Sequence, residues 1–127
     1  MMSRRIRMFA IAAAVLLAFS LEARAADAPY ISGGAGVDER DELLAKEKEY
    51  NLKIIVAEKS GDYLAGVTVV IESARKERVL DATMAGPILL ARLAPGTYTV
   101  RATSDRQTLT RTVIISAQGL RQVDFRW

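Results

Sequence analysis

Apolar side chains occupy every second position along most of the chain after Asn51. At residues 97–103, for example, Tyr98, Val100 and Ala102 alternate with threonine and arginine. A period of two is typical of a strand with one face buried and the other in solvent. Such runs, separated by turns, predict an all-β fold, a seven-stranded antiparallel β-sandwich. The predicted strands are residues 52–57, 67–72, 79–82, 88–93, 97–103, 107–116 and 121–127.

A helical pattern precedes these strands, at residues 37–50. Acidic residues lie in its first turn and lysines near its end, an order that complements the helix dipole. Asp38 suits the N-cap, and Glu42 and Lys46 have the favourable i,i+4 order. The apolar stripe is narrow, so we expect this short α-helix to lie on a surface. The stripe consists of Val37, Leu43, Leu44 and Tyr50.

Residues 1–25 have the pattern of a secretory signal peptide. A basic start is followed by an apolar run at residues 8–21 and by a small-residue end at Ala25. The run is shorter than the ~20 residues that a membrane-spanning helix needs. We therefore expect cleavage after Ala25, export to the periplasm, and no membrane span in the processed chain.

The chain is thus predicted to have three parts: a signal peptide at 1–25, a leader with an acidic amphipathic helix at 26–50, and a β-sandwich at 51–127. The leader is rich in glycine and small residues, so we expect it to be flexible unless Tyr30 and Ile31 dock on the sandwich.

Removal of the signal peptide changes the charge of the protein. The full chain has 18 basic and 15 acidic residues, but four arginines and one glutamate lie in residues 1–25. The rest of the chain has equal numbers of both signs. Without net charge or a basic cluster it has little attraction for phosphate backbones, so we expect no nucleic-acid partner.

The chain contains neither cysteine nor histidine. The first absence excludes thiol chemistry and disulfides, and the second removes the usual general base near neutral pH and the commonest metal ligand. Four carboxylates at the helix start have an electrostatic reason to be there and lack the loop that calcium needs. They are Asp38, Glu39, Asp41 and Glu42. We therefore predict no enzyme activity and no catalytic, cofactor-binding or metal-binding residues.

Two stretches resemble the carboxypeptidase regulatory-like domains, which have a transthyretin-like β-sandwich. Residues 60–69 read Ser-Gly-Asp-Tyr-Leu-Ala-Gly-Val-Thr-Val, and residues 93–100 read Leu-Ala-Pro-Gly-Thr-Tyr-Thr-Val. The resemblance covers residues 50–127 and implies the fold more than a role. The chain is also similar to small exported proteobacterial proteins that place an acidic helix before this sandwich, most of which have no assigned activity.

The chain departs from that family pattern in two turns. Ala-Gly-Pro-Ile at residues 85–88 replaces an Asp-Gly-x-Tyr step, and residues 104–106 lack an expected glycine. One branch of the transthyretin-like fold hydrolyses 5-hydroxyisourate with paired histidines, an arginine and a Tyr-Arg-Gly-Ser ending. This chain has no histidine and ends Asp-Phe-Arg-Trp, so that activity is not expected.

A polar face on two neighbouring strands is the best candidate for a binding surface. If the strands pair as a hairpin, these residues form a flat patch suited to a glycan or a partner strand, although such residues also suit any solvent-facing strand. They are Thr97, Thr99, Arg101, Thr103, Thr108, Thr110, Arg111 and Thr112. Trp127 shares the inward period of Val123 and Phe125, so we expect it to be the last core side chain.

These observations favour a non-enzymatic periplasmic binding or interaction module with a protein or envelope partner. An edge strand could accept a strand of the partner, with the leader and helix covering that edge. One alternative is a small-molecule or glycan binder, or a hydrolase, that uses a cleft between helix and sandwich. Another is an accessory structural subunit of an envelope complex.

Overall fold

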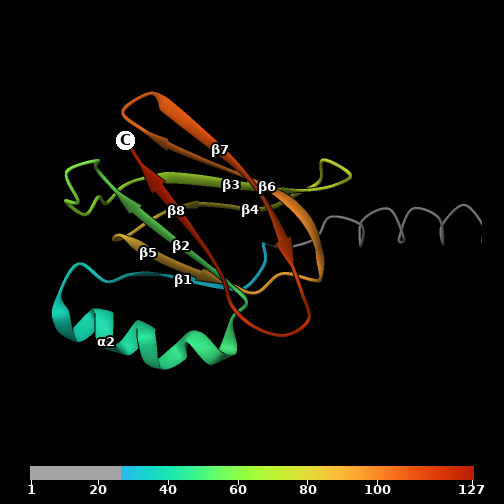
Figure 1. Ribbon diagram of the computed structural model, residues 1–127, viewed down its shortest axis with the longest axis horizontal. Helices are drawn as coiled ribbons and strands as arrows, with labels where there is room; N and C mark the ends of the chain where they lie inside the picture. The colour runs from blue at the N-terminus through green and yellow to red at the C-terminus, as the bar shows by residue number, and fades with distance from the viewer. Residues whose placement is uncertain (1–26) are drawn as a thin grey trace, which may run out of the picture.

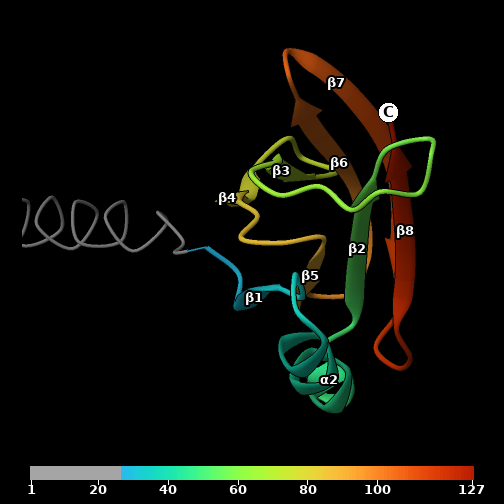
Figure 2. The same ribbon diagram turned by 90° about the vertical axis from the view of Figure 1, so that its left-hand side faces the viewer.

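The computed structural model describes residues 27–127, which form two four-stranded sheets and one short α-helix (Figures 1 and 2). The predicted all-β sandwich is confirmed at this level, and the predicted signal peptide lies outside the described residues. The elements are β1 (Tyr30–Gly33), α2 (Val37–Lys46), the 3-10 turn η1 (Glu47–Glu49), β2 (Leu52–Ala57), β3 (Thr68–Ser73), β4 (Arg78–Thr83), β5 (Ile88–Ala91), β6 (Gly96–Ser104), β7 (Gln107–Ile115) and β8 (Arg121–Arg126).

Sheet A has the strand order β1-β5-β2-β8, and sheet B has the order β4-β3-β6-β7. Most neighbouring strands are antiparallel, but β2 and β8 run parallel, from Leu52 opposite Arg121 to Ala57 opposite Arg126. The prediction of a wholly antiparallel sandwich is therefore wrong at this pair. A parallel pair needs a long crossover, and here the chain crosses between the two sheets several times before it returns as β8.

The structure has eight strands rather than the predicted seven, because residues 30–33 of the expected flexible leader form β1. This strand pairs antiparallel with β5 at the edge of sheet A. Just before it, the Ala28 N–H donates to the Val79 carbonyl of β4 at 2.8 Å, so the segment bridges the two sheets. Ser32 Oγ also accepts a hydrogen bond from the Ala85 N–H at 3.0 Å. A four-residue strand is too short to show a period, so only its partners define it.

The core lies between the sheets and takes side chains from every strand from β2 to β8. In β2 the alternate residues Leu52, Ile54 and Val56 are fully buried, as the period of two predicts, and they lie in one cluster with Phe125 of β8. Fully burying a side chain of this kind stabilises the fold by about 1.5–3 kcal/mol. Because the chain has no cysteine, this core has no disulfide to support it.

Helix α2 lies on the outer side of sheet A, as the narrow apolar stripe predicts (Figure 2). Its one buried side chain, Leu43, packs against Ile88 and Leu90 of β5. The N-cap is Gly36, not the expected Asp38, and no side chain caps the helix. At the helix start, the Glu39 carboxylate accepts a hydrogen bond from the Gly34 N–H, and the Arg40 guanidinium donates one to the Gly34 carbonyl. No helix within residues 27–127 is long and apolar enough to cross a membrane.

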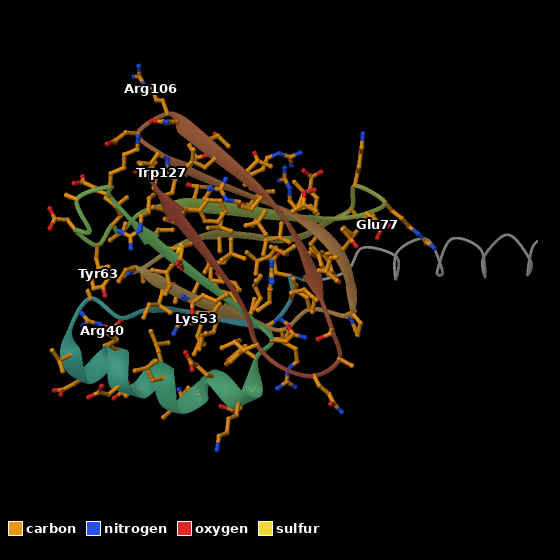
Figure 3. The ribbon with its side chains drawn as sticks, in the orientation of Figure 1. Arg40, Lys53, Tyr63, Glu77, Arg106 and Trp127 are labelled. Carbon is orange, nitrogen blue, oxygen red and sulfur yellow. The ribbon has the colours of Figure 1, made fainter. Side chains whose placement is uncertain are left out.

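The hairpin turn between β6 and β7 lies at residues 104–107, where a glycine was expected and none is present. Ser104 pairs with Gln107, so the loop has two residues, and both Asp105 and Arg106 have positive φ, at 45° and 69°. A two-residue hairpin of this kind favours glycine, since a side chain is disfavoured there. Here the long pairing of β6 with β7 holds Arg106 in that conformation, at the tip seen in Figure 3.

Candidate functional site

The outer face of sheet B presents a regular array of threonines. The hairpin forms as the candidate patch requires, with Thr103 opposite Thr108 and Thr99 opposite Thr112. Sheet pairing extends the array, because Thr68 lies between Thr103 and Thr83, so one row of threonines crosses all four strands. We call this surface the threonine face. Its members are Thr68, Val70, Glu72, Arg78, Asp81, Thr83, Thr97, Thr99, Arg101, Thr103, Thr108, Thr110, Thr112 and Ile114.

Arg111 does not belong to this face, which corrects the sequence-based grouping. It lies opposite Val100, whose side chain is buried between the sheets, and its guanidinium lies over the Phe125 ring at 5.6 Å from the centroid. The residue therefore points toward the interior at the edge where β7 meets β8. An inward charge at an edge strand discourages pairing with another chain, so Arg111 makes β7 a poor acceptor for a partner strand.

The charges of the threonine face are paired with one another. Arg101 forms an ion pair with Glu72 on the neighbouring strand, and Arg78 forms one with Asp81 at 3.1 Å. Helix α2 lies on the other sheet, and no element within residues 27–127 covers the face (Figures 1 and 2). The surface is therefore open, rich in hydroxyl groups, and electrically balanced.

Trp127 is less buried than predicted for a last core residue. It is only partly buried, and its ring packs against Phe125 with the centroids 6.2 Å apart. Its indole N–H donates to the Gln107 carbonyl at 3.0 Å, which links the end of β8 to the start of β7 (Figure 3). Trp127 thus closes one edge of the sandwich rather than filling its centre.

The carboxylates at the start of α2 do not gather into a metal site. Glu39 accepts a hydrogen bond from the Gly34 N–H at 2.7 Å, and Arg40 donates to the Gly34 carbonyl at 3.3 Å. The Arg40 guanidinium also lies over the ring of Tyr63, 5.1 Å from its centroid, as Figure 3 shows. The first two contacts tie the helix start to the loop after β1, and the third ties it to the loop after β2. Among the described residues, no group of three or more acidic side chains could hold a metal ion.

An open pocket lies at the end of the sandwich where β2 and β8 begin. Three connections meet there: η1 with the start of β2, the β5–β6 loop, and the β7–β8 loop. We call it the end pocket, and its volume is about 790 Å³. Its lining residues are Glu47, Lys48, Glu49, Tyr50, Asn51, Arg92, Leu93, Pro95, Ala117, Gln118, Gly119 and Leu120.

Hydrogen bonds from side chains to the backbone fix the floor of the end pocket. The Asn51 amide donates to the Leu93 carbonyl at 2.8 Å and accepts from the Leu93 N–H at 2.9 Å. The Tyr98 hydroxyl donates to the Ala94 carbonyl at 2.6 Å and holds the same loop. Burial raises the pKa of the Tyr98 phenol above its ordinary value. The β5–β6 loop is therefore anchored from two sides.

Charged groups at the pocket rim are not neutralised by one another. Arg92 donates through Nε, at 2.7 Å, and through Nη2 to the main-chain carbonyl of Glu49, not to its carboxylate. Lys48, Glu49 and Arg92 take part in no ion pair within the described part of the chain. Behind the rim, Glu47 is bound by Lys53, at 2.5 Å; Lys53 is only 9% exposed and lies between sheet A and α2 (Figure 3).

No motif or periodicity in the sequence indicates this pocket. Its lining residues come from three separate segments that share no motif, and they become neighbours only because the strands carrying them end or begin at the same end of the sandwich. A scan against models of protein families matches none, and a search of curated proteins finds no match.

Proposed function

We propose that the protein is a non-enzymatic binding module of the periplasm, exported with residues 1–25 as its signal peptide, and that its partner is a protein or another envelope component. The absence of histidine and cysteine from the whole chain supports a role without covalent chemistry. Residues 50–127 resemble carboxypeptidase regulatory-like domains. This resemblance implies a fold but no particular activity, so the function has to be inferred from the residues on the surface.

The observation that carries this proposal is the open threonine face. Helix α2 covers part of sheet A through Leu43, whereas the outer side of sheet B has no such cover within residues 27–127. The face is regular, and its four charges already form two ion pairs. A partner can therefore approach without having to desolvate an unpaired charge, which is the most costly step in forming a polar interface.

The face is a better candidate than an edge strand. In sheet A the leader itself occupies the edge of β5 as β1, and in sheet B the Ala28–Val79 hydrogen bond lies along β4. Arg111 discourages strand addition at β7. We therefore place the contact on the face rather than on the edge of β4, β5 or β7.

The test is crosslinking capture of the tagged protein from intact periplasm, with two lysine variants compared. Thr110→Lys places an additional positive charge on the threonine face, on β7 opposite Arg101, whereas Gln122→Lys places the same charge on an exposed position of β8 in sheet A. We expect the wild type and Gln122→Lys to crosslink the same partner and Thr110→Lys to lose it. Equal capture by both variants would place the contact elsewhere, and no partner at any growth stage would contradict the module. The mass of the tagged protein recovered from the periplasm also tests cleavage after Ala25.

A second candidate function is supported by the end pocket, which lies between η1 and the sandwich. Its volume is within the range of about 300–1,000 Å³ that is typical of small-molecule sites, and it combines apolar walls with charged groups at the rim. We propose a small-molecule or peptide-sized ligand for it. Binding there and partner contact through the threonine face are compatible, because the two sites lie on different surfaces.

A further inference from the structure

The guanidinium of Arg92 is fixed at the rim of the end pocket. Its Nε and Nη2 both donate to the carbonyl of Glu49, which caps the end of η1 and holds the side chain in one orientation. Its Nη1 has no hydrogen-bond partner among residues 27–127. The bond to the Glu49 carbonyl uses one side of the guanidinium and leaves the other side available to a ligand. Because the side chain is already held in one orientation, a ligand that binds it costs less conformational entropy.

The charge available at the rim is net positive. Lys48 and Arg92 contribute two cations, and the Glu49 carboxylate contributes one anion. Glu47 adds nothing further because Lys53 binds it at 2.5 Å. An anion is therefore favoured over a cation at this rim, and a planar fork such as that of arginine matches a carboxylate in particular.

The walls beside these charges are largely apolar. Leu93 is buried at the floor, Tyr50 is half-buried, and the exposed side chains of Pro95 and Leu120 lie on opposite loops. An inorganic anion would leave this surface in contact with water. A ligand with an aromatic or aliphatic body would cover it, at about 25 cal/mol per Å² removed from solvent.

We propose that the end pocket binds a carboxylate carried on an apolar body, either the C-terminus of a peptide or a free organic acid, with Arg92 as the carboxylate-binding residue. This inference deepens the second candidate function above and depends on it. It does not depend on the threonine face. The volume of about 790 Å³ is large enough for a few residues of a peptide and larger than one small acid requires.

The test is an NMR titration of the full chain at low salt with three probes. Acetyl-leucyl-phenylalanine has a free carboxylate, its C-terminal amide lacks the charge, and 3-phenylpropionate is a free acid without a peptide backbone. We expect the two acids to shift the amide signals of residues 47–51 and 117–120, and the amide to bind at least about tenfold more weakly. Similar affinities for the two acids indicate a free organic acid as ligand, and a strong preference for the peptide indicates a C-terminus.

The variant arm uses Arg92→Gln with Arg126→Gln as its matched control. Arg126 is an exposed arginine at the far end of β8, roughly 20 Å from the pocket by strand length. We expect Arg92→Gln to remove the preference for acid over amide and Arg126→Gln to keep it. Lys48→Gln, at an exposed position, supplies a second variant if Arg92→Gln disturbs the fold; we expect it to weaken acid binding by a smaller factor.

The outcomes separate the ligand class from the pocket itself. Equal binding of acid and amide at the pocket signals would overturn the carboxylate inference and keep the small-molecule candidate. Shifts confined to other regions, or none with any probe, would overturn the inference and count against the pocket as a site for ligands of this class. Neither result would affect the capture experiment on the threonine face.

Discussion

The threonine face and the end pocket are both open to solvent, but among residues 27–127 their charged side chains are paired on the face and unpaired at the pocket rim. On the face, Arg101 is paired with Glu72 and Arg78 with Asp81. At the pocket rim, Arg92 binds a main-chain carbonyl beside the unpaired carboxylate of Glu49. A charge that is already paired gives an incoming partner little, whereas an unpaired one can bind an opposite charge. This difference is the reason why we propose contact with a macromolecular surface at the face and ligand recognition at the pocket.

The two regions also differ in how they are built. The threonine face lies on regular strands, whose register is fixed by the buried alternate residues on the other side. The end pocket is made of connections, whose shape depends on a few hydrogen bonds from side chains to backbone, above all those of Asn51. Single substitutions should therefore affect the pocket more strongly than the face.

The largest expected effect is at the floor of the end pocket. Asn51→Ala removes both hydrogen bonds to Leu93 and leaves the part-buried N–H and carbonyl of Leu93 without partners. We therefore expect the free energy of unfolding to fall by about 2–3 kcal/mol. Urea unfolding measures the change. Gln118→Ala, at an exposed position on the same pocket, is the control and should stay within about 0.5 kcal/mol. Similar losses in both variants would show that Asn51 does not hold the floor.

A smaller effect is expected at Tyr98, which supports the β5–β6 loop from the core side. Tyr98→Phe removes the hydrogen bond to the Ala94 carbonyl and should lower the free energy of unfolding by about 1 kcal/mol at pH 7. Because burial raises the pKa of the folded phenol from its ordinary value of 10.0, its contribution to stability is fully present below pH 10 and is lost as pH rises through the folded pKa. We therefore expect the stability of the wild type to fall more steeply above pH 10 than that of Tyr98→Phe.

The control for this prediction is Tyr63→Phe, because the Tyr63 side chain is exposed. Unfolding curves recorded between pH 7 and pH 11 should show the steep high-pH loss for this variant as for the wild type. The same steepness in Tyr98→Phe would exclude Tyr98 as its source.

The smallest expected effect tests the charge comparison directly. A double-mutant cycle of Arg101→Gln and Glu72→Gln should give a coupling energy of about 0.2–1 kcal/mol, because the two side chains are still 46% and 23% exposed. The coupling should fall as salt is added. The parallel cycle of Arg92→Gln and Glu49→Gln should give a value near zero, since those side chains form no ion pair among the described residues. Equal couplings in the two cycles would remove the contrast between face and pocket.

The strands could be predicted where one face is buried and the other is not. Thr97–Thr103 alternates along its length, and β6 covers it with one residue more at each end. The same pattern placed the threonines on one face. Arg111 was grouped with them because it is polar, although a residue between Thr110 and Thr112 on a strand points to the opposite face. β1 was missed because its four residues have no usable period, and the parallel pairing of β2 with β8 was missed because period carries no information on strand direction.

The amino-acid sequence by itself determined the fold class, most strand positions, the helix on the surface and the absence of thiol and imidazole chemistry, because side-chain periodicity and composition are local properties of the chain. Only the tertiary structure decided that the leader forms an edge strand, that Arg101 is paired while Arg92 is not, and that three unrelated connections enclose a pocket. These features depend on which strands become neighbours and at which end each strand finishes, and contacts between distant segments determine both.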